Sequence, residues 1–194
     1  MFVKYPHISR LGASEVNGIL DGSCYVFPKL DGTNGSIFSI DGTICTGSRN
    51  RQLSINDDNA GFYSHVLSSP LRSNYAQFLH DYPFITLYGE WLVPHTLKNY
   101  ITEAWRNFYI FDVYDRSYDK FVNYLTYSTL LKAYGIPFIE AVKIDNPSVE
   151  ELRRLMENNT YLVSDGIGEG IVIKNYDFVN QYGRYAIAKM VASE

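Results

Sequence analysis

The chain has 194 residues, of which 46% are hydrophobic and 20% are charged, and its formal net charge is -4. This length and composition suit one well-cored domain, and the absence of a long apolar run argues against a membrane-spanning helix. The acidic balance excludes a broad basic face that coats nucleic acid, although a local cluster of cations could still hold phosphates.

Two cysteines, Cys24 and Cys45, occur in expected strands without the spacing of metal ligands. We therefore expect reduced core thiols rather than a disulfide or a zinc site. The first residues do not resemble a signal peptide, because Pro6 interrupts them at once. Together these features lead us to expect a cytoplasmic protein.

The most informative stretch runs from Lys29 to Gly35, after a first part, residues 1–23, in which we expect loops around at most one short helix. Short apolar runs at residues 24–27 and 36–40 predict strands on either side, so Lys29 lies at a junction between a strand and a loop. An ammonium at the end of a buried strand is disfavoured in its charged form, and a neutral lysine amine is a nucleophile.

The neighbours of this lysine favour a ligand-binding role. Asp31 supplies a nearby carboxylate, and Gly32 and Gly35 would let the backbone approach a ligand closely. The alternative is a lysine that extends from a strand end into solvent beside a turn, since short motifs match by accident. The rest of the chain must distinguish between the two.

A hairpin is predicted directly after this motif. Residues 37–46 form two strands joined by the dipeptide Asp41-Gly42, which favours a two-residue hairpin turn. The returning strand leads into Arg49 and Arg51, which the hairpin carries back towards the level of the lysine motif. Two arginines beside a nucleophile suit a phosphate, whereas the alternative is a pair of solvated loop charges.

The pattern becomes helical over residues 61–82, with a break at Pro70. His65 and His80 fall on these helices without partners at metal-ligand spacing, so we expect surface or packing histidines.

A largely buried strand containing Glu90 is predicted next, at residues 84–93. A buried carboxylate needs a partner. Glu90 could pair with a core arginine, or it could face a cleft and accept hydrogen bonds from ligand hydroxyls.

An aromatic strand is predicted at residues 108–114, where strict alternation places Tyr109, Phe111 and Val113 on one face. That face could belong to the core or form a platform on which bases stack.

The segment that follows contributes scaffold. Residues 120–134 predict an amphipathic helix, and a short strand is expected at residues 138–142. Ser148 and Glu151 form a capping box that opens a helix to about Met156.

The last third of the chain returns to charged residues. Residues 165–170 form a glycine-rich turn in which Glu169 stands between two glycines, at the mouth of a β-branched strand that ends in Lys174. The glycines would leave the carboxylate open to a ligand or a metal, whereas a plain turn before a core strand is the alternative. Residues 184–191 predict a final strand in which Lys189 interrupts apolar residues, and a lone strand lysine usually guards a sheet edge.

Five motifs in this order resemble those of the covalent nucleotidyltransferases, the superfamily of polynucleotide ligases and mRNA capping enzymes. Motifs I, III, IIIa, IV and V of that superfamily correspond here to residues 29–34, 88–91, 108–112, 169–174 and Lys189. The Gly-Thr-Asn after the lysine is most similar to the bacteriophage and RNA-editing type of ATP-dependent RNA ligase. The resemblance spans about residues 24–191, and five collinear motifs are far more specific than any one of them.

The resemblance implies covalent nucleotide transfer. Lys29 would attack the α-phosphate of ATP, expel pyrophosphate and carry AMP as a phosphoramidate. The AMP would then pass to a 5′-phosphate end, and a 3′-hydroxyl would displace it. Lys174 and Lys189 would be the other catalytic residues, facing the α-phosphate from neighbouring strands.

The resemblance also implies a set of cofactor-binding residues, namely Asp31, Asn34, Arg49, Glu90, Phe111, Glu169 and Val172. Glu90 would bind the ribose hydroxyls, and Arg49 would contact a phosphate or the ribose. Phe111 would stack on the adenine, with Val172 on the opposite side.

A divalent metal, Mg²⁺ or Mn²⁺, is implied because a triphosphate concentrates more negative charge than two or three cationic side chains offset. Glu169 would help to hold this ion or its waters. The implied partner is nucleic acid with 5′-phosphate and 3′-hydroxyl ends, with RNA preferred, and no membrane. A protein partner or a missing C-terminal domain could strengthen otherwise weak substrate binding.

Three features depart from the family pattern. Ile187 occupies the first of the two lysine positions that motif V usually has, so Lys189 alone must serve. Pro28 precedes the nucleophile where RNA-type relatives often have glutamate. The chain ends at Glu194, without room for the accessory domains of DNA ligases, capping enzymes or phage-type RNA ligases. We therefore expect a single adenylyltransferase domain over residues 1–194, either a catalytic fragment or an unusually small ligase.

The implied fold is α+β, the nucleotidyltransferase (ATP-grasp-like) fold, with two antiparallel sheets flanking a nucleotide cleft and peripheral helices. An ATP-dependent RNA ligase is the preferred function, and its small size would suit a virus. A small ATP-dependent DNA ligase is an alternative, because Asp31 is shared with that group. A catalytically silent nucleotide-binding module is another, because motif V lacks one lysine.

Overall fold

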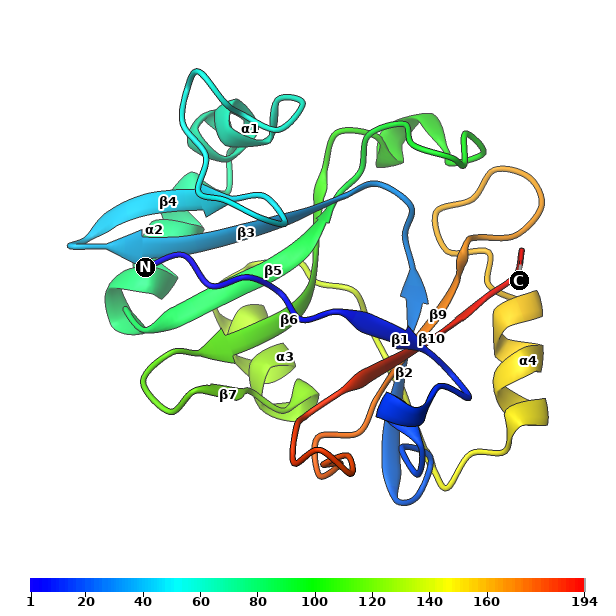
Figure 1. Cartoon of the computed structure of the whole chain (residues 1–194). Coiled ribbons are helices and arrows are strands. Elements are labelled where there is room, and N and C mark those ends of the chain that lie inside the picture. The colour runs from blue at the N-terminus through cyan, green and yellow to red at the C-terminus, as the bar shows by residue number, and fades with distance from the viewer. Residues whose placement is uncertain (194) are drawn as a thin grey trace. The chain divides into compact units, whose positions relative to one another are not determined.

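The computed structural model describes residues 1–193 (Figure 1). The chain forms two compact units, and each is built on one five-stranded sheet. Unit 1 contains residues 1–5, 32–93 and 106–139, whereas unit 2 contains residues 6–31, 94–105 and the described residues from 140 onwards. The predicted α+β architecture with two mainly antiparallel sheets is confirmed.

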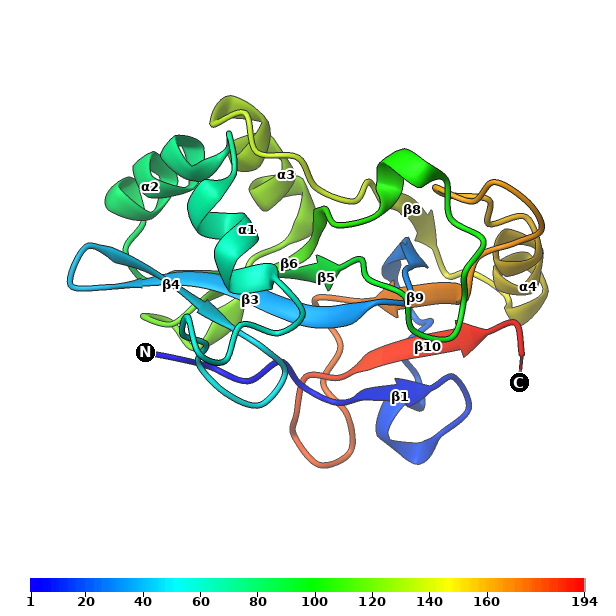
Figure 2. The ribbon, with the colours of Figure 1, turned by 90° about the horizontal axis from the view of Figure 1, so that it is seen from above.

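Unit 1 is a fully antiparallel sheet covered by three helices. In the order β4-β3-β5-β6-β7, its strands are β4 (Thr43–Gly47), β3 (Thr33–Ile40), β5 (Ile85–Trp91), β6 (Phe108–Asp115) and β7 (Lys120–Phe121). Figure 2 shows the helices on one face of this sheet, α1 (Phe62–Ser68), α2 (Arg72–Asp81) and α3 (Tyr124–Ala133).

Unit 2 is a sheet with the strand order β1-β10-β9-β2-β8. Its strands are β1 (Ile8–Arg10), β10 (Ile187–Val191), β9 (Gly170–Lys174), β2 (Ser23–Lys29) and β8 (Val142–Asp145). The β1–β10 pair is parallel and the others are antiparallel. The helices of this unit are α4 (Val149–Glu157) and two 3-10 turns, η1 (Ser14–Val16) and η2 (Thr102–Ala104).

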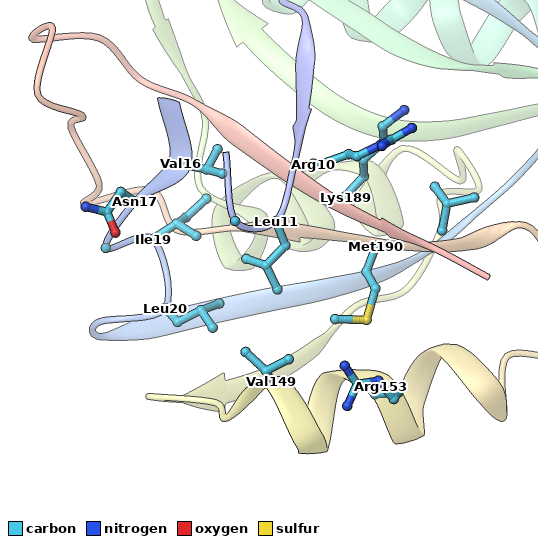
Figure 3. A pocket seen from close by; sticks show the side chains of 13 residues that line it. Arg10, Leu11, Val16, Asn17, Ile19, Leu20, Val149, Arg153, Lys189 and Met190 are labelled. Atoms are coloured by element: carbon cyan, nitrogen blue, oxygen red, sulfur yellow. The ribbon is translucent and has the colours of Figure 1, made fainter. Parts of the chain in front are cut away.

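One face of the unit 2 sheet forms an aliphatic core. Alternate strand residues such as Val26 and Ile173 are buried there, with Leu152 and Met156 from α4. A cavity of about 570 Å³ opens at the edge of this core, and Figure 3 shows Met190 pointing from β10 towards α4 beside it. Because side chains alternate along a strand, the lysines of β2, β9 and β10 that were predicted to be catalytic fall on the opposite face.

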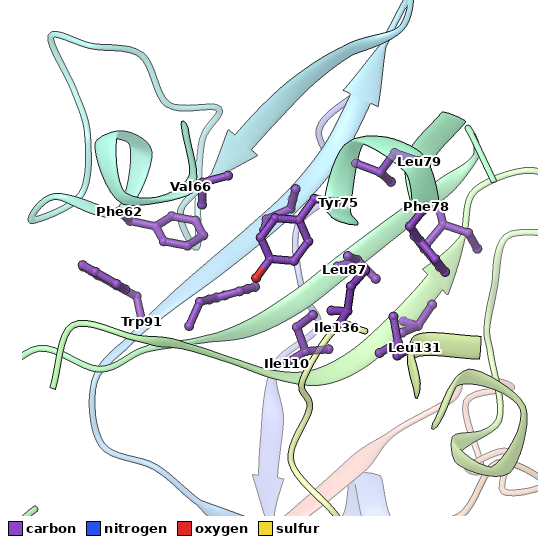
Figure 4. Packing of buried hydrophobic residues seen from close by; sticks show 14 of the residues in the cluster. Phe62, Val66, Tyr75, Phe78, Leu79, Leu87, Trp91, Ile110, Leu131 and Ile136 are labelled. Carbon is purple, nitrogen blue, oxygen red and sulfur yellow. The ribbon is translucent and has the colours of Figure 1, made fainter. Parts of the chain in front are cut away.

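The core of unit 1 is larger and more aromatic (Figure 4). Phe62 of α1 packs on Trp91 and Phe108, with ring centroids 5.7 and 4.8 Å away. A Cβ at Gly35 would lie 2.8 Å from the Phe62 ring, so only glycine lets α1 approach β3 this closely. Burial of each large apolar side chain stabilises such a core by about 1.5–3 kcal/mol.

The N-terminal segment covers part of the other face of the unit 1 sheet. The Tyr5 ring lies 4.9 Å from that of Tyr88, and its hydroxyl donates to Asp112 Oδ2 at 2.7 Å. Phe2 packs on Phe38 with a centroid separation of 6.3 Å. Asp112 is fully buried, and the Tyr5 hydroxyl satisfies one of its oxygens.

Several local predictions are confirmed. Asp41 and Gly42 join β3 to β4 with φ of 50° and 80°, the left-handed conformation that a two-residue hairpin turn requires. The helical stretch breaks at Pro70 into α1 and α2. Ser148 and Glu151 form the expected capping box at the start of α4.

Several boundaries are wrong, among them the start of the last strand, which lies at Ile187 rather than at residue 184, and two in the middle of the chain. The helix expected from residue 120 starts at Tyr124, because residues 120–121 pair as β7 and Asn123 caps the helix by accepting from the Leu125 N–H. The strand expected at residues 138–142 begins only at Val142, and Phe138 makes an isolated bridge instead. Both errors lie at element ends, where tertiary pairing decides.

The histidines have the predicted packing and surface roles, and the cysteines agree with the prediction in part. Cys24 is a buried free thiol, whereas Cys45 is free but only half-buried, so its expected core position is wrong. His65 packs against Trp91, with ring centroids 4.7 Å apart, and His80 is exposed. No helix within residues 1–193 is both long and apolar enough to cross a membrane.

Candidate functional site

Three of the predicted lysines lie on one face of the unit 2 sheet, opposite its apolar core. Cross-strand pairing places Phe27, Val172 and Lys189 side by side on β2, β9 and β10. Lys29 lies two residues after Phe27, and Lys174 lies two residues after Val172, so alternation gives both the same face. The sheet therefore gathers these lysines from three strands.

Lys29 is in direct contact with Glu169. Its Nζ lies 2.7 Å from Glu169 Oε2, and the two side chains are 21% and 24% exposed. The contact follows from the register, because Lys29 pairs with Gly170, the first residue of β9. The sequence suggested each residue separately, and the fold joins them across 140 positions of the chain.

Lys174 is a buried cation. Its side chain is 1% exposed, and its Nζ lies 4.0 Å from the centre of the Phe27 ring. This geometry excludes the alternative of a lysine that is merely exposed at a strand end. A desolvated cation–π contact of this kind is worth about 2 kcal/mol, so Phe27 helps to hold the charge in place.

The glycines beside Glu169 serve packing rather than ligand approach. A Cβ at Gly170 would lie 2.2 Å from the carbonyl oxygen of Met190, and one at Gly168 would lie 2.8 Å from Asn159 Nδ2. Gly32 in the lysine motif has the same role, since its Cβ would lie 2.3 Å from the Trp91 carbonyl. Packing within the protein therefore accounts for these glycines, and their role in leaving the sites open to a ligand stays a prediction.

The Asp31 carboxylate anchors the segment 94–105. Oδ1 lies 2.9 Å from His95 Nδ1, and Oδ2 accepts from the backbone N–H of Thr96 and Leu97 at 2.8 and 2.6 Å. The Asp31 N–H donates to the Tyr100 hydroxyl at 2.9 Å. Because both carboxylate oxygens have protein donors, this geometry does not support the predicted direct contact of Asp31 with the cofactor.

Glu90 and Asn34 lie side by side on the unit 1 sheet. They pair across β5 and β3, and Glu90 also pairs with Tyr109 of β6, so the three share one face. Glu90 Oε2 accepts from the Gly32 N–H at 2.9 Å, which means that no core arginine is needed to satisfy it. Among the described residues none donates to Asn34 Oδ1, although this atom is buried.

A β-bulge changes the predicted faces of the aromatic strand. The pairing of β5 with β6 shifts between Tyr88 and Gly89, so Val113 enters the core instead of sharing a face with Tyr109. Phe111 is half-buried, with its ring edge-on to Tyr5 at 5.1 Å and an interplanar angle of 70°. Strict alternation missed Tyr109 as the neighbour of Glu90, because a bulge leaves no clear sequence signal.

The two predicted arginines differ in their surroundings. Arg51 is paired with Asp57 through two hydrogen bonds of 2.5 and 2.8 Å, and this bidentate contact lowers the pKa of the Asp57 carboxyl. Arg49 is exposed in the loop after β4. The loop therefore leaves Arg49 as the better candidate for a ligand phosphate.

No preformed metal cage occurs in the part of the chain that the structure describes, since no three His, Cys, Asp or Glu residues gather there. A divalent ion would have to share Glu169 with oxygens of its ligand and with water. That donor set suits Mg²⁺, which proteins usually bind through one or two carboxylates and substrate phosphates.

Comparisons with known proteins agree with this geometry. The family model described as RNA ligase matches residues 22–191. No curated protein matches the sequence.

Solved structures of Naegleria gruberi RNA ligase are similar in fold. The structure with PPi has a TM-score of 0.73 and 18% identity, and the match covers 98% of this chain and 56% of that chain. A mutant with AMP and Mn gives the same four values. A mutant with ATP and Mn has a TM-score of 0.67 and 18% identity, covering 92% of this chain and 51% of that one. The chain thus spans about half the length of these solved structures.

Proposed function

Because the chain belongs to the RNA ligase family, we propose that it is an ATP-dependent RNA ligase that forms a covalent lysyl-AMP intermediate on Lys29. In this proposal residues 1–194 act as one adenylyltransferase domain. The observation that carries it is the 2.7 Å contact of Lys29 with Glu169, on a sheet face that also presents Lys174 and Lys189.

The first step joins the nucleotide to the protein. The Lys29 ammonium gives up a proton, and Glu169 is placed to accept it because their atoms are already in hydrogen-bond contact. The Lys29 amine attacks the α-phosphate of ATP, an N–P bond forms, and the P–O bond to pyrophosphate breaks. Pyrophosphate leaves with the electron pair of that bond.

The next two steps seal the strand. An oxygen of a 5′-phosphate end attacks the phosphorus of lysyl-AMP, the N–P bond breaks, and Lys29 regains its proton. A 3′-hydroxyl then attacks the 5′-phosphorus, loses its proton and displaces AMP. Lys174 and Lys189 offset the phosphate charge throughout, and the buried Lys174 is favoured for this role because Phe27 holds it before any ligand binds.

A divalent ion is part of the proposal. The donor set fits if Glu169 and phosphate oxygens hold the ion, which would then neutralise charge on the triphosphate. The N. gruberi structures with ATP or AMP contain Mn, which supports ATP with Mn²⁺ or Mg²⁺ for this chain.

Unit 1 residues are proposed to recognise the nucleotide. Asn34 Oδ1 is a buried acceptor without a described donor, so an N–H or O–H group of a ligand would satisfy it. Glu90 is proposed to bind the ribose hydroxyls, and Arg49 a phosphate or the ribose. Phe111 and Val172 are both proposed to contact the adenine. Asp31 acts through the segment that it anchors.

Labelling with α-labelled ATP, and separately with GTP, tests the proposal. We expect ATP with Mg²⁺ or Mn²⁺ to leave a label on the denatured protein, and Lys29→Ala to lose it entirely. Lys143→Ala, which removes an exposed lysine from β8 of the same sheet, is the matched control. Absence of label under either metal, after mass analysis has excluded an already adenylylated protein, would overturn the proposal.

The substrate class needs a second assay. We expect the labelled protein to seal a nick between RNA ends faster than one between DNA ends. A preference for DNA ends would favour a small DNA ligase, and labelling by GTP would indicate capping chemistry instead.

A further inference from the structure

We propose that Arg10 binds the phosphate groups that lie opposite Lys29 across the reacting phosphorus. These are the pyrophosphate that leaves in the first step and the 5′-phosphate that attacks in the second. This inference rests on the proposed function. It assigns a role to the first strand of the chain, where the sequence pattern gave no functional signal.

The register places Arg10 beside Lys189. The two residues pair in the parallel β1–β10 ladder, one position after the pair Ser9 and Ala188. Ser9 and Ala188 are buried, whereas Arg10 is exposed, as expected if the two pairs point to opposite faces. Figure 3 shows the Arg10 and Lys189 side chains extending in the same direction, away from Met190 and Arg153.

Arg10 therefore shares the sheet face of the proposed chemistry. Lys189 pairs with Val172, and Val172 pairs with Phe27, so the row continues from β1 to β2. On β10 itself the other positions of this face are apolar, because Ile187 is fully buried and Val191 is 8% exposed. Arg10 and Lys189 are thus neighbouring cations on this face, at the β1–β10 edge of the sheet.

The spacing of the strands separates the roles of the cations. Neighbouring strands lie about 4.8 Å apart, so the backbone of Arg10 is about 14 Å from that of β2, three strands away. Lys29 lies on β2, two residues beyond the Phe27 end of this row. A phosphate joined to Lys29 is therefore distant from Arg10, whereas a phosphate one or two bridging bonds further out, on the side of β10, would come nearer to Arg10. The geometry therefore favours contact with phosphates beyond the α-phosphate.

Phosphoryl transfer puts such a group in a defined place. The attacking and leaving groups lie roughly in line, so the position opposite Lys29 holds pyrophosphate in the first step and the 5′-phosphate in the second. Both carry phosphate oxygens that a planar guanidinium binds through two parallel hydrogen bonds. One arginine can therefore serve both steps.

Binding measurements in the Lys29→Ala background test the inference without catalysis. ATP and AMP differ by the pyrophosphate, so Arg10→Ala should weaken ATP binding about ten-fold in calorimetry with Mn²⁺ and change AMP binding less than about two-fold. Arg10→Lys should recover part of the loss. Arg153→Ala removes an exposed arginine of α4, and Figure 3 shows that the Arg10 and Lys189 side chains point away from it. This variant is the matched control and should change neither affinity.

A second arm separates the two sources of phosphate. Protein that already carries AMP on Lys29 is mixed with 5′-phosphorylated RNA, and the rate of AMP transfer is measured for Arg10→Ala. Weaker ATP binding together with slower AMP transfer supports the full proposal. Weaker ATP binding alone assigns Arg10 to pyrophosphate, and slower AMP transfer alone assigns Arg10 to the 5′-phosphate. Equal losses for ATP and AMP, no change in either arm, or the same change in Arg153→Ala would overturn it.

Failure of the proposed function has a different signature. If the Lys29→Ala parent binds neither ATP nor AMP, the nucleotide site itself is absent and both proposals fall. If the Lys29→Ala parent binds both nucleotides, but Arg10→Ala changes neither nucleotide binding in that background nor AMP transfer from protein that keeps Lys29, only the role of Arg10 is rejected.

Discussion

The two sheets present different chemistry on the faces that lie opposite their cores. In unit 2 that face carries cations, among them Lys29, Lys174 and Lys189. In unit 1 it carries hydrogen-bond acceptors, Glu90 and Asn34. Cations suit phosphates, whereas acceptors suit the hydroxyl and amino groups of a nucleoside. Under the proposed function, unit 2 would therefore supply the transfer chemistry and unit 1 the recognition.

The charged groups of both units are held before a ligand arrives. Phe27 lies against Lys174, and Glu169 against Lys29. In unit 1 the Gly32 N–H holds Glu90. Groups fixed in this way need little reorganisation during a reaction, which is the usual source of electrostatic catalysis.

The largest effect is expected from Lys174→Met. Methionine keeps an apolar chain over the Phe27 ring but removes the buried cation, so we expect lysyl-AMP formation to slow about 100-fold or more without loss of the fold. Single-turnover labelling measures the rate, and thermal unfolding checks the fold. Lys143→Met, at an exposed position of β8, controls for loss of a lysine. A rate of lysyl-AMP formation within a few-fold of that of the unmodified protein would contradict the role of unit 2 in the transfer chemistry.

Local patterns were sufficient to predict most of the elements and the candidate lysines. The β3–β4 hairpin depends on Asp41-Gly42, and the start of α4 depends on Ser148 and Glu151, so neighbouring residues decide both. The strand positions of Lys174 and Lys189 follow from short apolar runs in the same way. These features need no knowledge of distant partners.

Contacts between distant segments could not be predicted. Nothing in the sequence indicated that Glu169 would contact Lys29, or that the carboxylate of Asp31 would accept hydrogen bonds from the segment that begins near His95. Both contacts depend on strand register and loop path, which tertiary packing sets. The β-bulge between β5 and β6 is of the same kind, and it places Val113 in the core instead of on the expected aromatic face.

A smaller effect, on ATP affinity rather than on the rate of lysyl-AMP formation, is expected from Glu90→Gln. Glutamine can still accept from the Gly32 N–H but lacks the negative charge, so we expect ATP affinity in the Lys29→Ala background to fall about ten-fold. The maximal rate of lysyl-AMP formation, measured with Lys29 present and at saturating ATP, should change less than in Lys174→Met. A lower maximal rate with unchanged affinity would contradict the division between recognition and chemistry.

The smallest effects are expected in the two cores, each of which contains a titratable group. Burial lowers the pKa of His65 in unit 1, where its ring packs on Trp91. Burial raises the pKa of the Cys24 thiol in unit 2 to about 11, with a further contribution from the charge of Asp145. The two shifts oppose charge formation at opposite ends of the pH range.

The signs of the two pH dependences follow from proton linkage. Below a pH of about 6.5 the unfolded chain binds a proton at His65 more readily than the folded chain, so the free energy of unfolding should decrease as the pH falls. Above a pH of about 8.5 the unfolded chain loses the Cys24 proton more readily than the folded chain, so the free energy of unfolding should also decrease as the pH rises towards 11.

Urea unfolding across this pH range measures both slopes. His65→Phe should flatten only the acid limb and Cys24→Ala only the alkaline limb, while His80→Phe on the exposed side of α2 controls for an added ring. If His65→Phe leaves the acid limb unchanged, the acid sensitivity arises outside the aromatic core of unit 1.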